Sequence, residues 1–143
     1  MWSNVTAIEN YQTGDVLRVS GKVPFFPHYA VVFKRGNQLW VTHCVDAGIN
    51  TEPLADFEKR RTIYEVFRNE VTKKLTDKYI EEKSIELSAY GYNFMESNCE
   101  DYAKRIVGTY IGMDDRVTAI VVISITIITA LTIVIFVLIR KLK

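Results

Sequence analysis

The residue best suited to nucleophilic chemistry is Cys99, in the stretch Ser97-Asn98-Cys99-Glu100. From Cys99 onward, apolar residues recur with the spacing of an amphipathic helix at Tyr102, Ala103, Ile106, Val107 and Tyr110. Ser97 and Glu100 form a capping-box pattern, so we expect the helix to begin at Ser97 or Asn98. Cys99 then lies in the first turn, where unpaired backbone N–H groups favour a thiolate. The alternative is an inert buried cysteine.

The chain has two histidines, His28 and His43, and each lies in a strand-like run. The runs cover residues 28–33 and 38–44, and residues 34–37 between them suit a four-residue hairpin loop. If Phe33 pairs with Gln38, His43 lies directly opposite His28 on one face, with Cβ atoms about 4.5–5.5 Å apart. Cys44 then points to the other face, which disfavours it as their partner. A register error of one residue would separate the two histidines.

Composition narrows the classes of function. All 17 acidic residues and all but three of the 18 basic residues precede position 117, so that part is close to neutral. It has no positive field to gather nucleic acid, and we expect no nucleic-acid partner. Cys44 and Cys99 are too few for a disulfide framework and fit a reducing compartment. The number and spacing of the cysteines and histidines argue against a zinc site, and no cofactor or metal is predicted.

The elements that would position these residues can be read from periodicity and turn signals. Residues 16–20 form a short strand after the turn at 13–15, and 62–67 alternate as a further strand. Residues 45–57 read as a loop, and 71–90 carry a loose helical stripe that Gly91 would end. The cations at 59–61 form a solvated face or contact anionic headgroups.

Residues 117–139 contain no charged residue, proline or glycine. As a helix they would extend about 34 Å, enough to cross a hydrocarbon core of ~30 Å. We therefore expect a transmembrane helix over 117–139, followed by a short basic tail over 140–143. This layout predicts a tail-anchored, single-pass membrane protein with its N-terminal domain in the cytosol. The endoplasmic reticulum, mitochondria and peroxisomes are the expected membranes.

Four groups of residues together carry a resemblance to a known family. They are Gly14-Asp15-Val16-Leu17, Pro27-His28-Tyr29-Ala30-Val31, His43 and Asn98-Cys99-Glu100. In this order they resemble the lecithin:retinol acyltransferase-like (LRAT-like) family, and within it the H-rev107-type phospholipase A/acyltransferases, which also carry a C-terminal membrane anchor. Asp101-Tyr102 stands where that family usually has His-Phe, and the connection from His43 to Cys99 is shorter than usual.

The resemblance implies an α+β fold, a permuted NlpC/P60 (papain-like) domain with a small antiparallel sheet and helices, over residues 13–112. Residues 1–12 would precede it as an N-terminal segment. It also implies that Cys99 is the catalytic nucleophile, that His28 is the base, and that His43 is the third, orienting group. Backbone N–H groups at the start of the Cys99 helix would serve as oxyanion donors.

The implied activity is that of a membrane-anchored phospholipase A1/A2 and acyltransferase acting through an acyl-thioester on Cys99. Its partners would be a glycerophospholipid in a membrane and an acyl acceptor, which is water, an amine lipid or a lysolipid. Two alternatives stay open. One is an NlpC/P60-like cysteine peptidase or amidase, and the other is a non-enzymatic membrane adaptor with a vestigial site.

Overall fold

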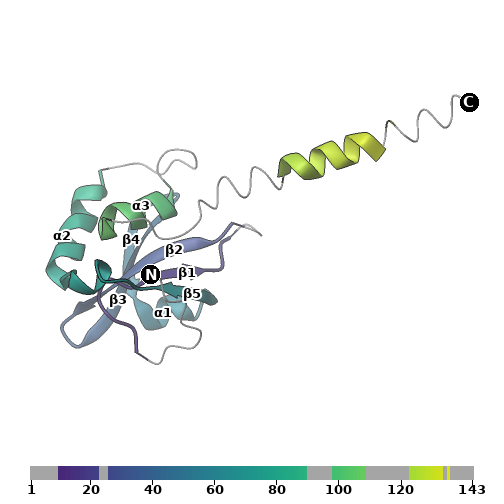
Figure 1. Ribbon diagram of the computed structural model, residues 1–143. Coiled ribbons are helices and arrows are strands. Elements are labelled where there is room, and N and C mark those ends of the chain that lie inside the picture. The colour runs from purple at the N-terminus through teal and green to yellow at the C-terminus, as the bar shows by residue number, and fades with distance from the viewer. Residues whose placement is uncertain (1–9, 23–25, 90–97, 109–122, 134, 136–143) are drawn as a thin grey trace, which may run out of the picture. The chain divides into compact units, whose positions relative to one another are not determined.

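The computed structural model describes residues 10–22, 26–89, 98–108, 123–133 and 135 (Figure 1). The chain divides into two compact units, Met1–Gly112 and Met113–Lys143. Of the residues used above, Ser97, Tyr110 and Gly91 lie outside the described residues.

The first unit is an α+β structure built on one five-stranded sheet. Its strands are β1 (Val16–Val19), β2 (His28–Arg35), β3 (Gln38–Val45), β4 (Gly48–Pro53) and β5 (Ile63–Phe67). Every neighbouring pair is antiparallel, in the spatial order β4-β3-β2-β1-β5. The helices are α1 (Leu54–Glu58), the short 3₁₀ helix η1 (Thr72–Lys74), α2 (Asp77–Leu87) and α3 (Cys99–Val107). Both long helices follow the sheet in the chain (Figure 1).

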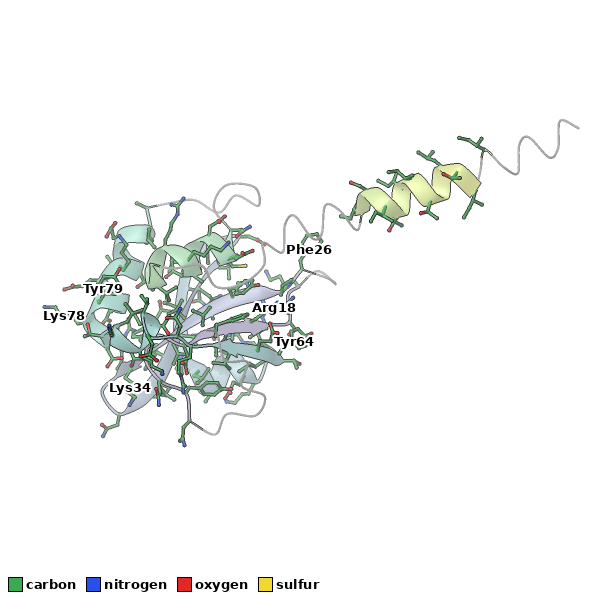
Figure 2. All side chains as sticks on the ribbon, viewed as in Figure 1. Arg18, Phe26, Lys34, Tyr64, Lys78 and Tyr79 are labelled. Carbon is green, nitrogen blue, oxygen red and sulfur yellow. The ribbon has the colours of Figure 1, made fainter. Side chains whose placement is uncertain are left out.

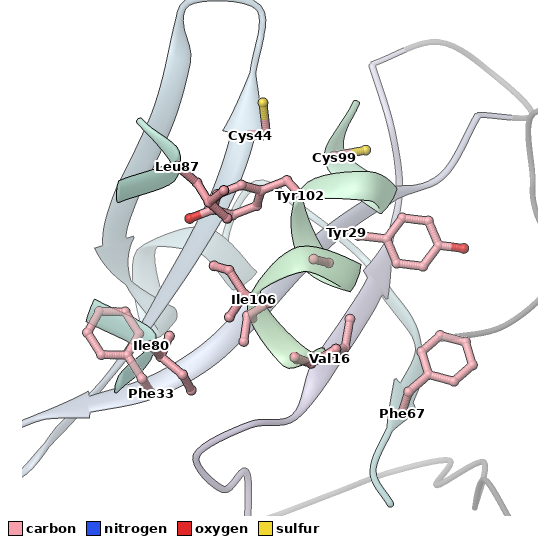
Figure 3. Close-up of a cluster of buried hydrophobic side chains, with 13 residues drawn as sticks. Val16, Tyr29, Phe33, Cys44, Phe67, Ile80, Leu87, Cys99, Tyr102 and Ile106 are labelled. Carbon is pink, nitrogen blue, oxygen red and sulfur yellow. The ribbon is translucent and has the colours of Figure 1, made fainter. Parts of the chain in front are cut away.

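Alternation along the central strands gives the sheet two buried faces, each with its own apolar cluster. The α3-side cluster consists of Val16, Tyr29, Val31, Phe33, Cys44, Phe67, Ile80, Leu87, Cys99, Tyr102, Ala103, Ile106 and Val107 (Figure 3). The α1-side cluster consists of Leu17, Val19, Ala30, Val32, Val41, Leu54, Phe57 and Val66. β2 contributes alternate residues to both clusters, which is why its run from 28 to 33 is buried throughout. Tyr64 of β5 and Tyr79 of α2 point outward instead (Figure 2), with 53% and 41% of their surface exposed.

The hairpin of β2 and β3 is tighter than the sequence suggested. Arg35 pairs with Gln38 and Phe33 with Trp40, so the loop is the two-residue turn Gly36-Asn37. Gly36 has φ +61°, the left-handed conformation that two-residue hairpin turns require. The expected pairing of Phe33 with Gln38 is therefore wrong by two positions.

This error does not separate the histidines, because a shift of two residues preserves the face on which each side chain lies. His28 and His43 still share one face, but they are diagonal neighbours across the two strands rather than directly opposed. Both rings lie near Phe57 of the α1-side cluster, with centroids 6.5 Å and 5.1 Å away.

Two further expectations about local structure need correction. The segment 45–57, expected as a loop, contains β4 and α1. β4 is an edge strand of mixed polarity that ends in Pro53, and such a strand lacks the apolar alternation that reveals central strands. The helix expected over 71–90 is η1 followed by α2, because Thr76 caps a new helix by accepting a hydrogen bond from the Tyr79 N–H.

In the second unit, residues 123–133 are helical and every side chain in this stretch is exposed. Among the described residues there is no helix long and apolar enough to cross a membrane. This finding corrects the expected fold class and localisation: the transmembrane helix over 117–139, and the tail-anchored placement in a membrane, are not supported. Residues 117–122 and 136–143 lie outside the described residues.

The turn before β1 joins the sheet to the segment that leads into α2. Gly14 has φ +89°, and a Cβ at this position would lie 2.1 Å from the Thr72 carbonyl oxygen. The next residue, Asp15, is fully buried and binds the Arg68 guanidinium through two hydrogen bonds of 2.6 Å. A bidentate pair of this kind fixes the start of β1 against the end of β5.

We expect Gly14→Ala to lower the midpoint of thermal unfolding strongly, because the substitution adds a backbone clash to an unfavourable φ. The strain of the left-handed conformation alone costs about 1–3 kcal/mol. Gly36→Ala is the matched control, since its φ is also positive but nothing lies within 4 Å of its Cβ position. Equal destabilisation of the two variants in calorimetry would show that contact with Thr72 does not matter.

Candidate active site

Cys99 is the first residue of α3, as the amphipathic spacing predicted. The N-cap is Asn98, whose side-chain oxygen accepts 3.0 Å hydrogen bonds from the N–H groups of Glu100 and Asp101. Asp101 completes the capping box by accepting from the Asn98 N–H, so the expected box of Ser97 with Glu100 is wrong by one residue. Since Asn98 occupies two of the free N–H groups, the helix offers the N–H of Cys99 itself as its oxyanion donor.

The Cys99 thiol is neutral in this structure rather than a thiolate. Its side chain is buried, and burial raises the pKa of Cys99 from 9.0 to about 11, with Cys44 and Glu100 adding smaller contributions. The backbone N–H groups of Tyr29 and Glu100 stabilise the thiolate but only partly offset the loss of water. The expected thiolate at the helix N-terminus is therefore wrong for the resting protein, because desolvation outweighs the helix dipole.

The two histidines form a direct hydrogen bond. His28 Nε2 lies 2.8 Å from His43 Nδ1, and the rings meet edge to face with an interplanar angle of 89°. Burial, followed by the nearby His43, lowers the pKa of His28 from 6.5 to about 3. Burial also lowers the pKa of His43, although Glu52 acts in the opposite direction. Both imidazoles are therefore neutral near pH 7.

Glu52 is the group that the sequence did not reveal. His43 Nε2 lies 3.0 Å from Glu52 Oε1, on the neighbouring edge strand β4. The carboxylate also accepts a 3.0 Å hydrogen bond from Asn50 Nδ2 and pairs with Arg60. These donors hold the Glu52 side chain, 13% exposed, in a fixed position beside His43. Glu52 was missed because residues 45–57 were expected to form a loop. In strand β4, Glu52 lies on the same face of the sheet as His43.

This chain of hydrogen bonds determines the tautomer of each ring. A carboxylate only accepts, so His43 must donate its Nε2–H to Glu52 and leave Nδ1 as an acceptor. His28 must then donate its Nε2–H to His43 Nδ1. Asn50 Nδ2 lies 3.3 Å from His43 Nε2, but in this tautomer both nitrogens are donors. They lie close together because each donates to Glu52 Oε1. The remaining nitrogen, His28 Nδ1, is unprotonated and has no hydrogen-bond partner among the described residues, so it can accept a proton.

Cys99 and His28 meet in one pocket of about 260 Å³. Cys99 belongs to the α3-side cluster, whereas the two histidine rings pack near Phe57 on the α1 side. The pocket brings Cys99 and His28 together at the start of β2, although they come from opposite faces of the sheet. No hydrogen bond joins Cys99 to His28 in the described part of the chain, and the Cys99 Sγ–H contacts the Pro27 carbonyl oxygen at 4.0 Å. Contacts between nucleophile and base are often long without substrate and shorten when it binds.

The second thiol, Cys44, lines the same pocket and is also free. As expected, it points to the face opposite the two histidines, and Figure 3 shows it at the same end of the α3-side cluster as Cys99. Burial raises its pKa as well, with a further contribution from Asp46. Cys44 lies inside strand β3 rather than at the first position of a helix, so its own N–H is not a helix N-terminal donor as that of Cys99 is.

Tyr102, one of the two residues that differ from the LRAT-like pattern, has a structural role. The Tyr102 hydroxyl lies 2.6 Å from Thr42 Oγ1, in a buried contact that fixes α3 against β3. Thr42 directly precedes His43, so this contact holds the cysteine helix and the histidine strand together.

Among the described residues, no group of three His, Cys, Asp or Glu side chains could hold a metal ion.

Comparisons with protein-family models, with curated proteins and with solved structures found no match to this chain. The chemistry of the site therefore rests on its own residues.

We expect the reactivity of Cys99 to rise continuously with pH, because a pKa raised to about 11 leaves the thiol protonated at neutral pH. In a Cys44→Ala variant, where Cys99 is the sole thiol, the rate of iodoacetamide modification should increase about tenfold per pH unit from 7 to 10. Mass spectrometry gives the rate, and the Cys99→Ala variant gives that of Cys44. A plateau below pH 8 would show a preformed thiolate and contradict the prediction.

Proposed function

We propose that this protein is a cysteine-dependent acyl-transfer enzyme. It takes an acyl chain from a glycerophospholipid onto Cys99 and passes the chain to water, to an amine lipid or to a lysolipid. The observation that carries the proposal is the Glu52–His43–His28 hydrogen-bond chain, which leaves an unprotonated nitrogen on a histidine that shares a pocket with Cys99, the first residue of a helix.

A packing role alone does not account for this arrangement. A buried histidine in a core needs one or two hydrogen-bond partners, and His43 has them. His28 donates from one nitrogen and leaves the other without a partner among the described residues, at a residue that lines the pocket of Cys99. A group of this kind next to a nucleophile is characteristic of a general base.

In the first step, His28 Nδ1 takes the proton of the Cys99 thiol while the sulfur attacks the ester carbonyl carbon. The carbonyl oxygen becomes an oxyanion that accepts a hydrogen bond from the Cys99 N–H. The positive charge on His28 is stabilised through His43 by the Glu52 carboxylate. When the tetrahedral intermediate collapses, the ester C–O bond breaks, and His28 returns its proton to the departing lysophospholipid hydroxyl.

In the second step, His28 takes a proton from the acceptor, whose oxygen or nitrogen attacks the thioester carbonyl carbon. The C–S bond then breaks, and His28 returns the proton to Cys99 Sγ. With water the products are a fatty acid and the free enzyme, and with an amine the product is an N-acyl lipid. At about 260 Å³ the pocket is smaller than the usual ligand cavity of ~300–1,000 Å³. It can hold the ester and adjoining glycerol, so the acyl chains would extend beyond it. The motif residues that resemble the LRAT-like family support a phospholipid ester as the acyl donor.

We expect Cys99 to become acylated when the protein is incubated with phosphatidylcholine. Intact-protein mass spectrometry should show the added mass of one acyl group, and peptide mapping should place it on Cys99. Cys44→Ala should keep the adduct and Cys99→Ala should lose it. An adduct on Cys44, or none with phosphatidylcholine but one with an amide from a peptide panel, would contradict the phospholipid proposal and favour a peptidase or amidase.

We expect graded losses of turnover along the hydrogen-bond chain. His28→Ala removes the base and should cost about 10²–10⁴-fold in kcat. His43→Gln should cost less, because an amide can accept from His28 and donate to Glu52. Glu52→Ala removes the acceptor that sets both tautomers and should cost at least about tenfold.

The matched control for Glu52→Ala is Glu65→Ala, because Glu65 of β5 also forms an ion pair, with Arg18 of β1. Circular dichroism checks that each variant is folded. If Glu52→Ala turned over as fast as the Glu65 control, Glu52 would have no part in orienting the histidines.

A further inference from the structure

The pocket that holds Cys99 and His28 is also lined by two cations, Lys22 and Arg61. They come from different parts of the chain, Lys22 from the connection between β1 and β2 and Arg61 from the residues before β5. Both charges lower the pKa of His28, which places them close enough to act on its ring. The catalytic groups therefore share their pocket with positive charge.

Arg61 is held in place without being neutralised. Its Nη1 donates a 2.7 Å hydrogen bond to the Ser20 carbonyl oxygen, which anchors the guanidinium beside the end of β1. No carboxylate lies within ion-pair distance of Arg61 among the described residues. Its two neighbours differ in this respect, since Lys59 pairs with Asp56 and Arg60 with Glu52. The basic run 59–61 is thus neither a uniformly solvated face nor a single patch. Within the described part of the chain, Lys59 and Arg60 are paired with carboxylates, whereas Arg61 at the pocket is not.

The other charged groups around the pocket do not cancel this charge. Lys22 lies 3.8 Å from Asp46, and both side chains are more than two-thirds exposed, so their ion pair is weak. These two charges balance each other. Cys99 and His28 are neutral, so among the described residues that line the pocket the guanidinium of Arg61 carries the positive charge that no carboxylate pairs with.

We propose that Arg61 binds a phosphate group of the acyl donor and so selects which esters reach Cys99, an inference that rests on the acyl-transfer function proposed above. A guanidinium presents several N–H donors in one plane, which matches the oxygens of a phosphate. In a glycerophospholipid the phosphate lies on the carbon next to an acylated one, so a single small pocket can hold both. Lys22 at the pocket edge adds attraction but no fixed geometry.

The test compares two soluble substrates that differ only in the phosphate, dihexanoylglycerol and dihexanoylglycerol phosphate. The wild-type chain should favour the phosphate-bearing ester in kcat/KM by about tenfold to a hundredfold, the contribution of a charge-assisted hydrogen bond. Arg61→Gln should reduce this ratio to near one. The ratio is the informative quantity, because any effect of Arg61 on the basicity of His28 applies to both substrates.

Arg35→Gln is the matched control, since Arg35 pairs with Glu81 at the other end of β2. It should keep the wild-type ratio, and a similar fall there would reveal only a general effect of charge. An Arg61→Gln ratio equal to that of the wild type would overturn the proposal.

A binding measurement separates this inference from the proposed function. Glycerol 3-phosphate, a free phosphate without an ester, should bind the wild-type chain in calorimetry about tenfold or more tightly than it binds Arg61→Gln. This result would support the phosphate site whether or not either ester acylates Cys99. If neither ester acylated Cys99, the proposed acyl-transfer function would be wrong and the phosphate site would still stand. Equal affinity of both chains for glycerol 3-phosphate, with an equal substrate ratio, would show that Arg61 recognises neither a lipid headgroup nor a free phosphate.

Discussion

The hydrogen bond from His43 Nε2 to Glu52 Oε1 determines the chemistry of the site. Because a carboxylate accepts but cannot donate, this bond sets the tautomer of His43, which in turn sets that of His28. It requires β4 to lie beside β3, and the sheet order places it there. Phe57 of α1 packs near both rings, and both histidines are buried, which limits the access of water to these bonds. Without Glu52, either nitrogen of either ring could carry the proton, and His28 Nδ1 would have no fixed role.

Burial explains why the nucleophile and base rest as neutral groups. It raises the pKa of Cys99 to about 11 and lowers that of His28 to about 3, so an ion pair between them is unfavourable before substrate binds. Proton transfer must then accompany attack on the carbonyl, when the developing oxyanion and the Glu52 carboxylate compensate the separated charges. The same burial protects the free thiol, because a protonated sulfur reacts slowly with solutes that do not fit the pocket.

Sequence patterns predicted the elements whose periodicity is strong and missed those defined by tertiary contacts. The helix at Cys99 and the shared face of the two histidines followed from apolar spacing. The register of their hairpin did not, because Gly36-Asn37 and a four-residue loop both fit the same residues. Glu52 was missed because an edge strand of mixed polarity resembles a loop in the sequence. The thiol state was wrong because the helix dipole can be read from the sequence, whereas the burial that outweighs it comes from packing with Tyr29 and Cys44 on distant strands. An apolar run at 117–139 predicted a membrane span that the structure does not support.

The most direct test of the central claim is the protonation state of each histidine nitrogen in the full chain, measured by ¹⁵N nuclear magnetic resonance of the imidazole rings. With two histidines in the chain, a His43→Gln variant assigns the signals. At pH 7 both rings should be neutral, with the proton on Nε2 and an unprotonated Nδ1, and His28 should stay neutral to about pH 4 because its pKa is about 3. A proton on His28 Nδ1 at pH 7, or a His28 that titrates near 6.5, would contradict the account.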